Sequence, residues 1–154
     1  MNILPALKLM KELEGKMAAL YAWYSDEFKS EPAAASVFEE LSSEEISLLD
    51  IIQSRIRVLQ EKSKTLSACE MDATSIVEAL DRIESIQNSP PRNVEEAIRS
   101  ALDLEKSAAE SQYRCAFEES CAPVSGLVRS LGEGSIKHIH GLVDFASDLG
   151  ISLS

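Results

Sequence analysis

Four long stretches of the chain carry apolar residues three and four positions apart, and each run is interrupted near its middle by a polar residue. The runs are Leu7, Met10, Glu14, Met17, Tyr21, Tyr24 and Phe28; Phe38, Leu41, Glu45, Leu48, Ile52, Arg55 and Leu59; Val94, Ile98, Ala101, Glu105, Ala108 and Gln112; and Val124, Val128, Leu131, Ser135, His138, Leu142 and Phe145. This spacing places the side chains on one face of an α-helix. Four helices that must each bury one face predict an all-α bundle.

Proline, glycine and capping residues predict where these helices begin and end. Pro32 separates the first helix from the second, Asn93 is a favourable N-cap for the third, and Gly150 can close the fourth. The expected helices are residues 4–29, 33–62, 93–120, and a last one that follows Pro123 and ends at residue 149.

The connection between the second and third helices is much longer than the other two. It is expected to hold a short helix over residues 75–87, with Ile76, Leu80 and Ile83 on one side. Short, long and short connections suit an antiparallel pair, a crossover and another antiparallel pair, which is a four-helix bundle. The single domain, residues 1–154, would then consist of a helix pair at 4–62, a crossover at 63–92 and a helix pair at 93–149.

Composition excludes several classes of function. The 15 basic and 26 acidic residues give a net charge of −11, which argues against binding to a phosphate backbone. No apolar run approaches the ~20 residues that a membrane-spanning helix needs, and no basic leader precedes the first apolar residues, so we expect no membrane span and no signal peptide. Three cysteines without a CxxC motif (Cys69, Cys115 and Cys121) suit reduced thiols, so we expect a cytoplasmic protein.

The polar residues on the apolar faces are the candidates for chemistry. A buried carboxylate needs a partner or a shifted pKa. Glu14, Glu45, Glu105 and His138 come from four different helices, and at one level of the bundle they could share a cation. His140 lies about 200° around the helix from His138, so it should face solvent or a neighbouring subunit.

The helix pairs also repeat. Corresponding positions are separated by 105 − 14 = 91 residues between the first and third helices, and by 135 − 45 = 90 and 138 − 48 = 90 between the second and fourth. The second helix offers EISL (Glu45 to Leu48) and the fourth offers SIKH (Ser135 to His138). Superimposed, the two segments reconstruct Glu-x-x-His, because each holds the half that the other lacks.

This layout resembles the ferritin-like superfamily, and its rubrerythrin branch most of all. LKLMKELEGKMAALY and IRSALDLEKSAAESQY are similar to the first and third helices of that family, and FEELSSEEISLLDII and LVRSLGEGSIKHIHGL resemble the second and fourth. The resemblance implies a carboxylate-bridged di-iron or di-manganese site, to which two helices each supply a Glu and two each supply a Glu-x-x-His. Of the six positions this chain keeps Glu14, Glu45, Glu105 and His138, whereas leucine and serine occupy the other two.

The two losses leave a ligand set that suits one ion better than two. Glu44 lies about 100° around the helix from Glu45, so we expect it not to replace the missing carboxylate. Tyr21, Tyr24 and Tyr113 could hydrogen-bond the glutamates or simply fill the core.

We expect one divalent ion, iron first with manganese or zinc as alternatives, in a rubrerythrin-like protein of metal handling or the oxidative-stress response. The alternative is a metal-free bundle that serves as a binding or dimerisation module. We also expect a homodimer, and the sequence leaves open whether the protein is an enzyme and which protein would donate electrons to it.

Overall fold

The computed structural model describes residues 1–61, 70–117, 122 and 124–153. These residues form five α-helices and no strand; a lone antiparallel bridge joins Asn2 to Glu70. The helices are α1 (Ile3–Glu27), α2 (Pro32–Glu61), α3 (Thr74–Asn88), α4 (Val94–Phe117) and α5 (Ser125–Asp148). The predicted all-α class and all five predicted helices are confirmed. The predicted ends at residues 62 and 120 lie outside the described residues.

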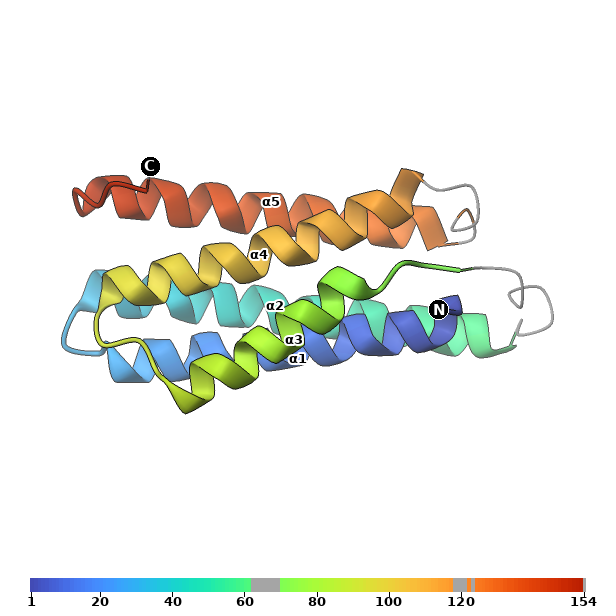
Figure 1. Ribbon diagram of the computed structural model, residues 1–154, viewed down its shortest axis with the longest axis horizontal. Coiled ribbons are helices and arrows are strands. Elements are labelled where there is room, and N and C mark those ends of the chain that lie inside the picture. Colours follow the sequence, from blue (N-terminus) through green and yellow to red (C-terminus); the bar gives the residue numbers. More distant parts are fainter. Residues whose placement is uncertain (62–69, 118–121, 123, 154) are drawn as a thin grey trace.

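Two helix pairs and one crossover helix make up the bundle (Figure 1). Helix α1 packs along α2, and α4 packs along α5. The short helix α3 runs obliquely between the two pairs and contacts both α1 and α4. The predicted order of helix pair, crossover and helix pair is therefore present, and α3 covers one side of the bundle.

The predicted start of α4 and end of α5 are confirmed. Asn93 accepts a hydrogen bond at Oδ1 from the backbone N–H of Glu96, with an N···O distance of 2.9 Å. This bond satisfies one of the amide groups that the first turn of a helix leaves unpaired. At the other end of the chain, Gly150 adopts a φ of +73°, a left-handed conformation that glycine reaches without strain and that ends α5.

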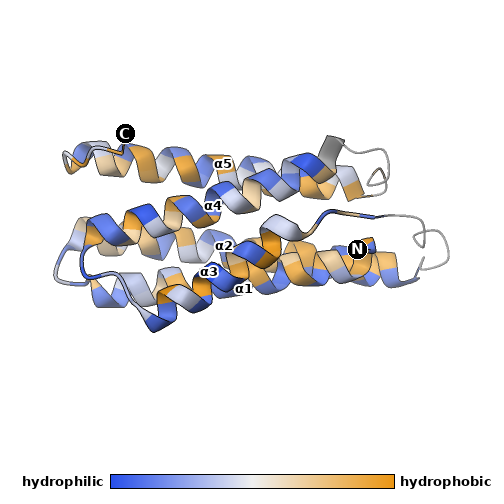
Figure 2. Cartoon of the chain, in the orientation of Figure 1, coloured by the Kyte–Doolittle hydropathy of each residue, from blue (hydrophilic) through white to orange (hydrophobic). Residues whose placement is uncertain are grey.

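The apolar faces meet in one continuous core. Figure 2 shows hydrophobic and hydrophilic residues alternating along the helices, as expected of amphipathic helices that each bury one face. The predicted stripe is wrong at Arg55, which is exposed, because Ile56 takes the buried position between Ile52 and Leu59. On α3 the buried residue between Ile76 and Ile83 is likewise Ala79, while Leu80 is only half-buried.

Two sequence-based expectations about the rest of the chain have structural counterparts. Among the described residues, no helix is both long and apolar enough to cross a membrane. Cys115 is a buried thiol in α4, whereas Cys69 and Cys121 lie outside the described residues.

Candidate metal site

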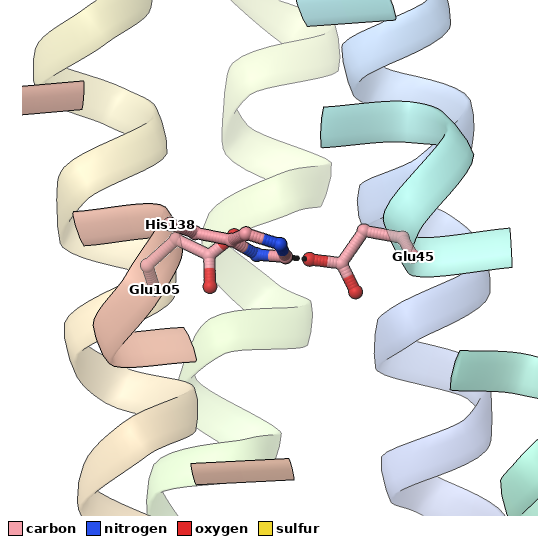
Figure 3. Close-up of side chains that lie close together, drawn as sticks. All are labelled: Glu45, Glu105 and His138. Atoms are coloured by element: carbon pink, nitrogen blue, oxygen red, sulfur yellow. Dashed lines mark hydrogen bonds and ion pairs between the residues drawn. The ribbon is translucent and has the colours of Figure 1, made fainter. Parts of the chain in front are cut away.

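Three side chains from three helices converge in the middle of the bundle (Figure 3). Glu45 projects from α2, Glu105 from α4 and His138 from α5, and their exposed fractions are 1%, 0% and 3%. His138 Nδ1 lies 3.1 Å from Glu45 Oε1 and 3.1 Å from Glu105 Oε1. Each residue offers one ligand atom, and the three ligand atoms all lie within 4.8 Å of one another. The structure thus brings together three of the four predicted metal residues.

The apolar stripes explain why these polar side chains point inward. Each occupies a stripe position whose neighbours one turn away are buried or half-buried, so the helix cannot rotate the polar residue into water without exposing the rest of the stripe. On α4 the flanking residues are Ala101 and Ala108, both fully buried. Their small side chains leave room for the carboxylate of Glu105 and for the imidazole that meets it.

Two oxygens in this group lack hydrogen-bond donors. Glu45 Oε2 and Glu105 Oε2 are buried and have no hydrogen-bond partner among the described residues. Leaving a buried polar atom unpaired costs about 1–3 kcal/mol, and more when the atom is charged. A cation between the two carboxylates would remove this cost, so the residues present fit a bound metal ion.

Glu14, the fourth predicted ligand, lies in the same layer but has a different partner. Its Oε1 accepts a hydrogen bond from the side-chain amide of Gln112, with an N···O distance of 3.0 Å. The amide oxygen of Gln112 in turn accepts a bond of 2.9 Å from the hydroxyl of Ser135. Glu14 is 2% exposed, and it is not among the three residues whose ligand atoms converge.

Burial and mutual repulsion raise the pKa values of two carboxyl groups in this layer. Burial raises the pKa of Glu14 above its ordinary 4.5, although a hydrogen bond with Glu45 opposes that rise. Burial raises the pKa of Glu45 well above 4.5, and the charges and hydrogen bonds of Glu14 and Glu105 raise it further. Burial and the neighbouring carboxyls therefore favour the protonated form of Glu45 when no cation neutralises the layer.

Tyr21 fixes the third glutamate. Its hydroxyl donates a hydrogen bond to Glu105 Oε1 at an O···O distance of 2.9 Å. Burial raises the pKa of Tyr21 well above 10, and the neighbouring carboxylates raise it further, so the phenol stays protonated and remains a donor. Of the two alternatives that the sequence leaves open for Tyr21, the structure shows the hydrogen bond to a glutamate.

The other two tyrosines have different surroundings. Tyr24 shares a 2.7 Å hydrogen bond with Ser100 and packs against Phe38, with ring centroids 5.1 Å apart. The ring of Tyr113 lies against Gly132, where an added Cβ would come within 3.0 Å of it. Tyr24 is therefore a core residue, and Gly132 permits close packing of α5 on α4.

Glu44 approaches the site from its outer side. Its Oε2 lies 2.6 Å from His138 Nε2, and its other oxygen lies 3.3 Å from the ammonium group of Lys137. Glu44 is not among the three residues whose ligand atoms converge. Its contact with His138 was not predicted from the sequence, and it arises because a glutamate side chain is long enough to cross from α2 to the imidazole on α5. A bond from Nε2–H to Glu44 would orient the ring with Nδ1 toward Glu45 and Glu105.

The charges around His138 affect its own titration. Burial opposes a charge on the imidazole, but the hydrogen bonds and charges of Glu105 and Glu44 outweigh burial and raise the pKa above its ordinary 6.5. Without a metal ion, the ring therefore favours the imidazolium form, which donates from both nitrogens. Metal binding through Nδ1 would release one of these protons.

One further prediction about the surroundings of the site is confirmed, namely that His140 faces outward. His140 and Glu133 are both exposed, so neither belongs to the buried layer. Leu48 is half-buried on α2, and its Cδ1 would lie 3.7 Å from a Cβ added at Gly134 of α5. The leucine thus fills space beside α5 and offers no ligand atom.

Comparisons of the chain with protein-family models, with curated proteins and with solved structures found no match.

Proposed function

We propose that this protein binds one divalent metal ion through Glu45, Glu105 and His138, with Glu14 beside them. One observation carries the proposal: three buried ligand atoms from three helices converge, and both glutamates keep an oxygen without a hydrogen-bond donor. Two ionised carboxylates and a neutral imidazole would balance the charge of a divalent ion. Such a group has little other reason to be buried, since charged side chains in a core are costly unless they are paired.

The donor set narrows the identity of the ion. Carboxylate oxygen and imidazole nitrogen suit iron, manganese and zinc, whereas soft metals prefer the thiolate and thioether ligands that this group lacks. Iron is the first candidate because the two helix pairs and the crossover are the arrangement that a ferritin-like, rubrerythrin-type bundle implies. Such an ion would supply redox chemistry in metal handling or in the response to oxidative stress. Tyr21 and Glu44 would hold the ligands Glu105 and His138 in place.

Metal analysis tests the proposal most directly. Protein purified without a histidine tag, stripped with a chelator and titrated with Fe²⁺, Mn²⁺ or Zn²⁺ should take up one equivalent per chain. Glu105→Ala should abolish uptake, because it removes a ligand from the middle of the group. The matched control is Glu133→Ala, which removes an exposed glutamate from α5 and should leave uptake unchanged. Two equivalents per chain with peroxide turnover would contradict a single-ion site.

A metal-free role is the second candidate, and a specific observation favours it. Gln112 and Tyr21 already donate hydrogen bonds to Glu14 and Glu105, Ser135 donates to Gln112, and Glu44 accepts from His138. With a shared proton in place of a cation, the layer could hold the bundle together while the outer surface binds a partner or a second copy. No uptake of metal after reconstitution, together with a stable His138→Leu variant, would support this candidate and exclude the metal site.

A further inference from the structure

The polar layer has two unlike halves. In one half, Glu45 and Glu105 face the imidazole of His138 and keep oxygens without donors. In the other half, Glu14 faces the amide of Gln112, which in turn faces the hydroxyl of Ser135. The first half presents oxygen and nitrogen ligand atoms to a common point. In the second half, the NH₂ group of Gln112 points toward the carboxylate of Glu14.

The hydrogen bonds fix which way the amide of Gln112 points. The NH₂ group of Gln112 faces Glu14, because its nitrogen lies 3.0 Å from Glu14 Oε1 and a carboxyl oxygen accepts hydrogen bonds from an amide N–H. The amide oxygen then faces Ser135, whose hydroxyl can donate to it. Both side chains are buried, with exposed fractions of 2% for Gln112 and 3% for Ser135, so no water competes for these bonds. The bond from Ser135 to the amide oxygen therefore keeps the NH₂ group of Gln112 directed at Glu14.

We propose that Gln112, oriented by Ser135, limits the site to one metal ion. This inference rests on the proposed metal-binding function and names the residues that set its stoichiometry. A cation beside Glu14 would meet the positive end of an amide dipole, and the amide oxygen that could bind it is already occupied by Ser135. The amide N–H of Gln112 occupies the side of Glu14 Oε1 that a second cation would need, so the second half of the layer is closed to an ion.

The test exchanges the amide for a carboxylate of the same shape. Gln112→Glu would place a second carboxylate against Glu14, and two facing carboxylates require a cation or a proton between them. We expect the wild type to bind one equivalent of Mn²⁺ or Zn²⁺ and Gln112→Glu to bind two, counted by native mass spectrometry and by calorimetric titration. Gln87→Glu makes the same exchange at an exposed position of α3 and should remain at one equivalent.

A second variant covers the case in which Gln112→Glu does not fold. Ser135→Asp would put an acceptor where the hydroxyl donor now lies, so the amide of Gln112 would turn its NH₂ group to residue 135 and its oxygen to Glu14. Two facing acceptors again favour a cation, and this variant should also bind two equivalents.

The outcomes separate this inference from the proposed function. One equivalent in the wild type and in both variants would overturn the role of Gln112 and leave the metal site intact. Two equivalents of metal in the wild type would also overturn the role of Gln112. No metal in the wild type but one in Gln112→Glu would refute the proposed function while supporting the closing role of Gln112. No metal in any of these proteins would overturn both.

Discussion

Glu45→Gln should change the stability of the metal-free and metal-loaded protein in opposite directions. The exchange keeps the shape of the side chain and removes its charge. Glu45 is 1% exposed, and one of its oxygens has no hydrogen-bond donor. In the metal-free protein, the new amide could donate to Glu14 and Glu105, which approach Glu45 closely enough to raise its pKa by hydrogen bonding. The variant should therefore gain hydrogen bonds where the native protein must share a proton.

The size of each effect follows from these contacts. Removing one unpaired buried oxygen should raise the free energy of unfolding of the metal-free protein by about 1 kcal/mol, at the low end of the cost of such an atom. For a domain of this size, that corresponds to a Tm increase of about 2–4 °C. Loss of a ligand should lower metal affinity at least about 100-fold, the upper limit for loss of a residue that merely supports a ligand. That factor is about 2.7 kcal/mol, so metal should raise the Tm about 5–11 °C less than in the wild type.

Differential scanning calorimetry with chelator and with excess metal, together with a metal titration, measures both effects on the same samples. Glu133→Gln, at an exposed position of α5, is the control and should leave both melting temperatures unchanged. Equal destabilisation of Glu45→Gln in the two conditions would show that Glu45 has a structural role only. An unchanged metal-induced shift would refute the assignment of Glu45 as a ligand.

Three further predictions concern charge and packing around the site. The pKa of Glu45 is raised well above 4.5, so the folded state keeps a proton that the unfolded chain has released. The stability of the metal-free protein should therefore fall as the pH rises from 4.5 through the raised pKa. Denaturant titrations in chelator should show this fall, and Glu45→Gln should flatten it. Glu44→Gln should weaken metal binding about 10-fold by removing the charge next to Nε2 of the site histidine, and an unchanged affinity in a metal titration would exclude that contribution. Gly132→Ala should lower stability by about 1 kcal/mol, since a Cβ would lie 3.0–3.3 Å from the Tyr113 ring. Gly141→Ala, with nothing within 4 Å of the added Cβ, should raise stability by up to about 1 kcal/mol. Melting temperatures of the two variants that move in the same direction would contradict this packing argument.

Most of the fold could be predicted from helical periodicity. The stripes place Glu14, Glu45, Glu105 and His138 in the core because burial of a helix face is a property of spacing, and spacing is visible in the sequence. The same rule failed at Arg55, where steps of three and four residues can be taken in either order and only packing against the neighbouring helices decides between them.

Periodicity could not predict how far a side chain extends or in which direction a hydrogen bond points. Glu44 lies off the stripe by its backbone position, yet its carboxylate reaches His138, because α2 and α5 lie close enough for a long side chain to cross between them. Gln112 was on the predicted stripe, but its role depends on which end of its amide faces Glu14. That orientation depends on a hydroxyl from another helix, which no spacing rule reports.

The repeat explains why half a signature from each copy can still make a site. The ninety-residue repeat makes α2 and α5 equivalent helices, and their polar positions meet at one level of the bundle. Glu45 from the first copy therefore lies 3.1 Å from the imidazole of His138 from the second, as closely as ligands of one ion need to lie. The two replaced positions have separate surroundings: Ser135 directs Gln112 toward Glu14, and Leu48 fills space beside α5. Both positions fall outside the converging group of Glu45, Glu105 and His138, so the geometry that the proposed single ion needs does not depend on them.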